Sequence, residues 1–164
     1  MTPLLTVDVT IAADDWRRML PDADAAVRGA AEAAWRSLDP AGPAEVSVLL
    51  TDDDTVRQLN ARHRGIDRPT NVLSFALGET AHGPGQPSML GDVVLAAGVV
   101  AREAAAQGKP AARHISHLVV HGMLHLLGYD HETDSQAETM EALELRVLAG
   151  LGFPNPYLNH EAAE

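Results

Sequence analysis

The feature that most constrains this chain is a set of three histidines, His121, His125 and His131, in the stretch HGMLHLLGYDH. On an α-helix, positions i and i+4 lie one above the other, with Cβ atoms about 6 Å apart. His121 and His125 therefore share one face of a helix. Gly128 can adopt the left-handed conformation that ends a helix, so the chain can turn back and bring His131 to the same point.

Three imidazoles at one point predict a metal site. Three neutral ligands leave the charge of a divalent ion intact and a fourth coordination position open, which is typical of catalytic zinc sites. The chain has no cysteine, so ligands are limited to His, Asp and Glu. The alternative is that these histidines are packed core residues, but three uncompensated imidazoles on an apolar helix would be costly. We expect one zinc ion per chain, held by His121, His125 and His131.

The same spacing matches the long zinc signature of one class of metalloproteases. Those enzymes need a glutamate directly after the first histidine as general base, and this chain has Gly122 there. A peptidase remains possible only if Asp130, Glu132 or Asp134 supplies the base.

The rest of the chain predicts a single α+β domain with an approximately four-stranded mixed sheet, about five helices, and the metal site at the end of a central helix. Alternating or buried apolar runs indicate the strands, and apolar residues at helical spacing indicate the helices. The expected strands are 4–10, 45–50, 71–77 and 91–96, and the expected helices are 22–38, 52–62, 98–107, 111–127 and 135–149. Residues 62–69 and 78–90 are expected to be loops. The domain is expected to span 1–152, with 153–164 a disordered tail.

Composition excludes several classes. The chain of 164 residues has no apolar run long enough for a bilayer and no signal-peptide pattern at its start, so we expect a cytoplasmic protein with no membrane partner. The net charge is −11, but residues 57–113 carry seven basic and four acidic side chains, a net of +3. An anionic substrate should therefore meet this middle segment, unless the difference is only the scatter of a solvated surface.

Three motifs resemble the YbeY family of bacterial endoribonucleases and rRNA maturation factors: HRGIDRPTNVLSF, LGDVVLA and HLVVHGMLHLLGYDH. The resemblance covers roughly residues 45–145. It implies that His121, His125 and His131 bind zinc, and that Arg64, expected in the loop before PTNVLSF, is the basic residue that nuclease function needs. The family usually has tyrosine where this chain has His63, which leaves Arg64 aligned.

The resemblance also implies a biological role. It points to cleavage of single-stranded RNA, with DNA not expected, in 16S rRNA 3′-end maturation and ribosome quality control. The implied partners are rRNA, small ribosomal subunit proteins and an Era-type GTPase. The alternative from another class is a non-catalytic ribosome assembly factor in which a structural zinc pins the last two helices together.

Several further residues are candidates for the site. Arg64 lies in the most cationic stretch of the chain, and a guanidinium matches phosphate oxygens two at a time; otherwise it is a solvated arginine. His114 and His117 share the helix face of the ligand pair and either line a substrate cleft or face solvent, with His117 also a possible partner of a ligand. Asp130 either holds a ligand imidazole or caps the following turn. Thr70, Asn71 and Ser74 either border the cleft or bond locally. No general base is assigned.

Overall fold

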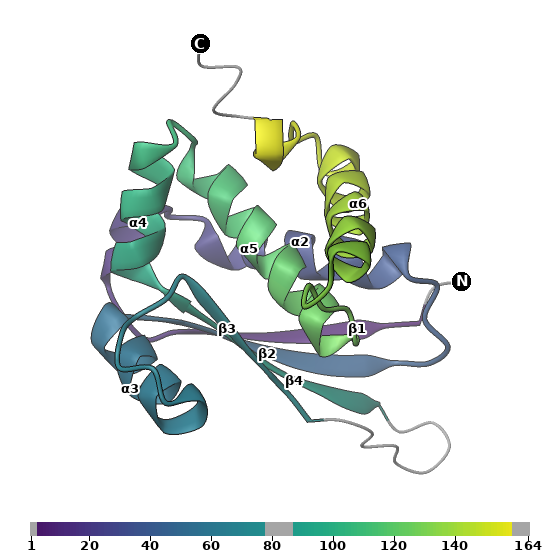
Figure 1. The fold of residues 1–164 in the computed structure, drawn as a ribbon, viewed down its shortest axis with the longest axis horizontal. Helices are drawn as coiled ribbons and strands as arrows, with labels where there is room; N and C mark the ends of the chain where they lie inside the picture. Colours follow the sequence, from purple (N-terminus) through teal and green to yellow (C-terminus); the bar gives the residue numbers. More distant parts are fainter. Residues whose placement is uncertain (1–2, 78–86, 159–164) are drawn as a thin grey trace.

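The computed structural model describes residues 3–77 and 87–158. Most of the expected loop at 78–90, and the last six residues of the expected tail, lie outside these ranges. Within them the structure is a four-stranded mixed sheet with six α-helices and one short 3-10 helix (Figure 1). The predicted α+β class is confirmed.

The sheet has the strand order β1-β2-β4-β3. Its strands are β1 (Leu5–Ile11), β2 (Ala44–Thr51), β3 (Val72–Ala76) and β4 (Ser88–Ala96). Strands β1, β2 and β4 run parallel to one another, and the edge strand β3 runs antiparallel to β4. The sheet is therefore mixed, as predicted, and β3 forms one edge of it.

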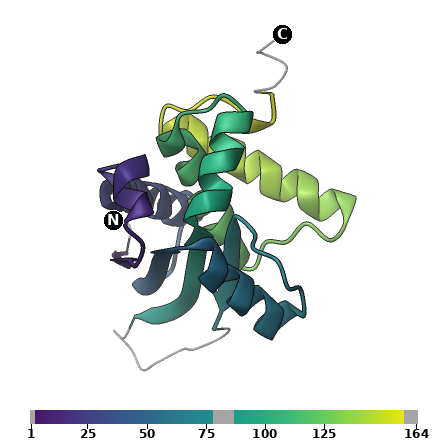
Figure 2. The same ribbon diagram turned by 90° about the vertical axis from the view of Figure 1, so that its left-hand side faces the viewer.

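Most of the helices cover one face of the sheet, and the helix that follows β2 lies on the other face (Figures 1 and 2). The helices are α1 (Asp15–Met19), α2 (Ala23–Ser37), α3 (Asp53–Arg64), α4 (Ala97–Ala106), α5 (Ala111–Leu126) and α6 (Asp134–Gly150), followed by the 3-10 helix η1 (Pro156–Leu158). Helix α5 is central, since it packs against α2, α4, α6, β3 and β4. None of the helices in the described part of the chain is both long and apolar enough to cross a bilayer.

Two hydrophobic clusters hold these layers together. Alternate residues of β4 point to opposite faces, as strand geometry requires. Val93 and Leu95 join the main core beneath α2, α5 and α6. Val94 and Ala96 join a smaller cluster that packs against Val56 of α3 on the other face. The helix that carries His121 and His125 is thus anchored in the main core.

The structure differs from the sequence-based expectations at several places. The short helix α1 was not predicted, and its buried Trp16 donates to the carbonyl of Thr51. Strand β4 begins at Ser88 and not at 91, because parallel pairing with β2 extends it backward. Arg64 was expected in a loop, but it is the last residue of α3. Helix α3 ends there because Gly65 adopts a left-handed conformation, with φ of 71°. Residues 156–158, in the expected tail, form η1.

Candidate metal centre

The three histidines come together at the C-terminal end of α5. His121 and His125 lie one turn apart on this helix, and His131 follows in the connection to α6. One nitrogen from each ring lies within 4.8 Å of the other two. Gly128 has a φ of 101°, so the chain reverses where the sequence predicts, and the expected convergence of the three side chains is confirmed.

The hydrogen bonds of the first two rings determine which nitrogens face the common point. His121 Nδ1 lies 2.7 Å from Oε2 of Glu144, and His125 Nδ1 lies 3.0 Å from the carbonyl oxygen of Tyr129. Because both partners are acceptors, each Nδ1 carries the proton and each neutral ring has a bare Nε2. The two Nε2 atoms are 3.1 Å apart, so in the tautomers that these bonds favour, two lone pairs face each other.

A cation resolves this opposition. Two nitrogens bound tetrahedrally to zinc at about 2.0 to 2.1 Å would be separated by roughly 3.3 Å, close to the separation of the two Nε2 atoms. Burial, helped by the neighbouring His121 and His131 rings, lowers the pKa of His125, which favours the neutral form that metals bind. The donor set and its geometry therefore fit a divalent metal ion.

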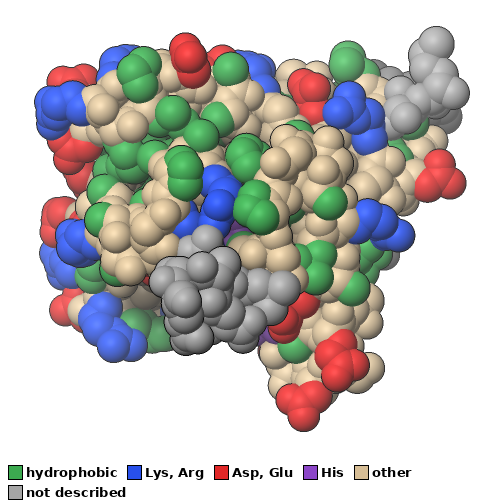
Figure 3. All heavy atoms as spheres, turned by 90° about the horizontal axis from the view of Figure 1, so that it is seen from above, with side chains coloured by type: hydrophobic (Ala, Val, Ile, Leu, Met, Phe, Trp, Pro, Cys, Tyr) green, Lys and Arg blue, Asp and Glu red, His purple; other side chains and the backbone are tan. Residues whose placement is uncertain are grey.

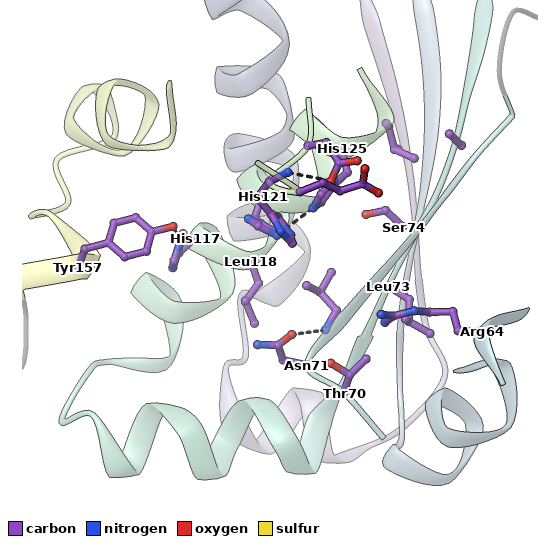
Figure 4. A pocket seen from close by; sticks show the side chains of 16 residues that line it. Arg64, Thr70, Asn71, Leu73, Ser74, His117, Leu118, His121, His125 and Tyr157 are labelled. Atoms are coloured by element: carbon purple, nitrogen blue, oxygen red, sulfur yellow. Dashed lines mark hydrogen bonds between the residues drawn. The ribbon is translucent and has the colours of Figure 1, made fainter. Parts of the chain in front are cut away.

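The histidines open onto a pocket of about 760 Å³ between α5 and β3 (Figure 4). Arg64 lies across this pocket from His121 and His125, and Leu73 and Ser74 of β3 lie between them (Figure 4). Asn71, Asp130, His117 and Tyr157 are among the other lining residues. The pocket is thus bordered by the histidines on one side and by a guanidinium on the other.

Arg64 is exposed, and within residues 3–77 and 87–158 it forms no ion pair. Its neighbour in the cationic stretch, Arg57, differs because Asp54 and Asp67 both pair with it. The hydrogen bonds that Arg57 donates to the carboxylates of Asp54 and Asp67 raise the pKa of Arg57. Arg57 is therefore occupied within the fold, whereas the Arg64 side chain is available to a ligand.

The remaining candidates have distinct roles. His117 lines the pocket and bonds to Glu144 across 2.9 Å, whereas His114 is buried and bonds to Glu103. His114 therefore faces neither solvent nor the main pocket. Asp130 accepts a hydrogen bond from the backbone N–H of His131, which matches the turn-capping alternative; the carbonyl of Tyr129 holds His125 instead.

Thr70, Asn71 and Ser74 all line the pocket. Asn71 also donates to Glu103, and Ser74 donates to the carbonyl oxygen of Gly122 across 3.1 Å. Asn71 and Ser74 therefore form local hydrogen bonds and also border the cleft. The bond from Ser74 joins β3 directly to the helix that carries His121 and His125.

Glu144 of α6 and Tyr157 of η1 are site residues that the sequence did not indicate. They follow His131 by 13 and 26 positions, outside every motif singled out above. The one sequence signal concerns Glu144, because a glutamate occupies an inward position of α6 where an apolar residue is expected. That signal becomes meaningful only once the packing of α6 on α5 is known.

A family model described as "Endoribonuclease YbeY" matches residues 10–152. Proteins named "Endoribonuclease YbeY" from Rhodopseudomonas palustris strain BisB5 and from a Bradyrhizobium strain are 52% and 49% identical, over 94% and 98% of this chain and 82% and 96% of their own. The protein of that name from Magnetococcus marinus is 55% identical over 71% of this chain and 84% of its own.

The fold also resembles a solved structure. A solution structure of a Thermotoga maritima protein superposes with a TM-score of 0.53 and 23% identity, covering 89% of this chain and 91% of the other. At that level of identity the likeness concerns the fold alone. The family match and the curated relatives carry the assignment: the chain belongs to the YbeY endoribonuclease family.

Proposed function

We propose that this protein is a zinc-dependent endoribonuclease that cleaves single-stranded RNA. The observation that carries the proposal is the convergence of three imidazoles on one side of a pocket whose other side presents Arg64, which forms no ion pair within residues 3–77 and 87–158. The names of its relatives supply the class of substrate. We further propose that its substrate is rRNA, cleaved in 16S 3′-end maturation and in ribosome quality control.

In this proposal His121, His125 and His131 hold one zinc ion through a nitrogen of each ring. A zinc ion held there would supply Lewis-acid chemistry toward a phosphoryl oxygen. The chain contributes the position of the substrate, since the pocket between α5 and β3 brings a phosphodiester between the histidines and Arg64.

Arg64 then stabilises the negative charge that develops on the phosphate oxygens. A guanidinium is permanently charged at working pH and presents N–H groups in a fork that matches two oxygens. Its contribution is greatest in the transition state, where that charge is largest. Because Arg64 is exposed and makes no ion pair among the described residues, binding a phosphate breaks no ion pair within that part of the chain.

The charge distribution bears on the partners. Acidic and basic side chains are interspersed over the face seen in Figure 3, with no continuous basic surface there. A net charge of −11 opposes binding of bulk RNA, which depends on clustered cations. We therefore propose that the protein reaches its substrate in the cytoplasm through small ribosomal subunit proteins and an Era-type GTPase.

A zinc peptidase is the weaker candidate. A Cβ atom added at Gly122 would lie 2.8 Å from Cγ1 of Val93 and 3.1 Å from Oγ of Ser74. That position points into the sheet, so a glutamate there has no room and no path to the histidines. The peptidase mechanism thus lacks a general base at position 122, and it would depend on Asp130 or Glu132, which line the pocket, or on Asp134.

The test compares zinc content and RNA cleavage in two variants. His125→Ala should lose both, because it removes a ligand. Arg64→Ala should keep zinc and lose cleavage, by about 100-fold or more if one charge-stabilising donor is removed. Arg62→Ala is the matched control, since Arg62 is an exposed cation in the same helical turn that does not line the pocket. Equal losses of RNA cleavage in Arg62→Ala and Arg64→Ala would mean that Arg64 contributes only its positive charge and has no specific role in the pocket. Cleavage by zinc-free His125→Ala would exclude the proposed function.

A further inference from the structure

Glu144 is a buried charged residue whose role lies outside the proposed chemistry. Glu144 is 0% exposed, although an ionised carboxylate is costly to bury unless it is paired and hydrogen-bonded. It lies on the face of α6 that packs against α5. The burial of this carboxylate therefore depends on the hydrogen bonds that it accepts.

Three donors surround this carboxylate. Oε2 lies 2.7 Å from Nδ1 of His121, and Oε1 lies 2.9 Å from Nε2 of His117. The hydroxyl of Tyr157 donates to Oε1 as well. Burial alone would raise the pKa of Glu144, but hydrogen bonds from His117, His121 and Tyr157 outweigh it and lower the pKa to about 2.

The bond to His121 has a geometric consequence. A metal-binding histidine is oriented by the acceptor at its other ring nitrogen, which also selects the tautomer. The carboxylate at Nδ1 keeps the proton there and leaves Nε2 bare, directed at Nε2 of His125. Only one carboxylate oxygen is used in this way, so the other is free to be held by His117 and Tyr157.

Tyr157 reaches this carboxylate from the far end of the chain. It belongs to η1, which lies beyond residues 10–152 that the family model matches. The segment leading to it is attached to the domain, since Phe153 packs against the main core and Lys109 bonds to the carbonyl of Pro156. The Tyr157 ring also contacts His117 edge-on, with centroids 5.5 Å apart.

We propose that Glu144 is a positioning residue that holds the His121 ring in its metal-binding tautomer, and that Tyr157 in turn holds Glu144. The C-terminal segment 153–158 is thereby part of the support of the metal centre and not an appendage. This inference rests on the proposed metal site, but not on RNA cleavage. It assigns to α6 and η1 the task of keeping the first ligand pointed at the metal.

The experiment measures zinc affinity by competition with a chromophoric chelator, in the full chain. Glu144→Gln keeps the size of the side chain but removes its charge and one acceptor, and should weaken zinc binding by about 10- to 100-fold. Glu138→Gln is the matched control, because it makes the same change at an exposed site on the same helix and should leave the affinity unchanged. Tyr157→Phe removes a single hydroxyl and should weaken zinc binding by a smaller factor, about tenfold or less.

A second readout needs no metal. The ring ¹⁵N shifts of His121 in the metal-free protein should report a proton on Nδ1 in the wild type, and a mixture of tautomers in Glu144→Gln. A merely structural carboxylate would lower the melting temperature of Glu144→Gln without changing either zinc affinity or this tautomer, and that result would overturn the proposal. If Glu144→Gln does not fold, Tyr157→Phe decides, since unchanged affinity and tautomer there exclude the role of Tyr157 in the network.

The outcomes also separate this inference from the proposed function. A wild-type protein that binds no zinc removes the metal site, whatever the variants do. Wild-type zinc binding with unchanged affinity in both Glu144→Gln and Tyr157→Phe removes the positioning role alone. Weakened zinc binding in these variants supports the positioning role even if the purified protein cleaves no RNA.

Discussion

His114 has the same side chain as the three proposed ligands His121, His125 and His131, but its surroundings give it a different task. It lies two turns before His121 on α5, and it is 4% exposed. Its Nε2 lies 2.9 Å from Oε1 of Glu103, which also accepts from Asn71. His114 therefore joins α5 to α4 and to the start of β3. The chemistry of a histidine is determined by its neighbours, and four histidines on one helix face divide into structural and metal-facing roles.

The stability of the fold should depend on the protonation of His114. Burial lowers its pKa below the ordinary 6.5, although the bond to Glu103 opposes this effect. Below pH 6.5 the unfolded chain therefore binds a proton more readily than the folded chain, and stability falls as the pH decreases through that window. We expect His114→Gln, which can still donate to Glu103, to lose less stability than the wild type between about pH 7.5 and about pH 5.5.

The measurement is urea unfolding of both proteins with excess chelator, so that ligand histidines titrate alike in the two. His117→Gln serves as a comparison on the same helix. An identical pH dependence in wild type and His114→Gln would show that His114 does not couple protonation to folding.

At the scale of elements, the placement of the metal site depends on how closely α5 approaches the sheet. Gly122 lies between the two ligand positions of α5, and its missing side chain lets the helix lie against Val93 of β4 and Ser74 of β3. The hydroxyl of Ser74 bonds to the Gly122 carbonyl at this contact. Because Ser74 also lines the pocket, the distance between the histidines and β3 is determined by this one close approach.

Gly122→Ala should therefore destabilise the fold, even though alanine is the better helix former. Its Cβ would lie 2.8 Å from Cγ1 of Val93, and overpacking of this kind costs about 1 to 3 kcal/mol. Gly29→Ala is the control, because Gly29 lies within α2 with nothing near its missing Cβ. That change should stabilise the fold by roughly 0.5 to 1 kcal/mol. Chemical denaturation of the two variants measures both changes in the free energy of unfolding. Stabilisation by Gly122→Ala would contradict the close packing.

At the scale of the whole molecule, the hydrophobic core and the metal centre are separate. The main cluster contains residues from the sheet, α2, α5 and α6, and none of His121, His125 and His131 belongs to it. The histidines lie at the edge of the core, where α5 ends and the chain turns toward α6. The apolar packing that holds α5 and α6 in place therefore involves other side chains than these three.

Removal of zinc should leave the fold intact. Far-ultraviolet circular dichroism should keep its helical signal after chelation, because α5 and α6 remain packed through the core. Ligand linkage alone predicts a loss of about 3 kcal/mol when zinc was present at about 100 times its Kd, or roughly 5 to 10 °C in melting temperature for a chain of this size. Loss of the helical signal at room temperature would instead favour a structural metal, as in a non-catalytic assembly factor.

The sequence by itself determined what depends on neighbours along the chain. The spacing of His121 and His125 on one helix face follows from helical periodicity, and Gly128 marks the reversal that brings in His131. The strands and longer helices followed from alternation and periodicity in the same way. Local geometry is sufficient in these cases because a few backbone angles link the residues concerned.

Only the tertiary structure decided which distant side chains meet at that helix. Glu144 and Tyr157 approach His121 across α6 and η1, Ser74 meets Gly122 from the sheet edge, and Arg64 comes to the pocket because β3 is the edge strand. These meetings depend on how layers pack and on the order of strands. The physical reason is that such distances come from the burial of whole apolar faces, to which residues throughout the chain contribute, so no short stretch of sequence encodes them.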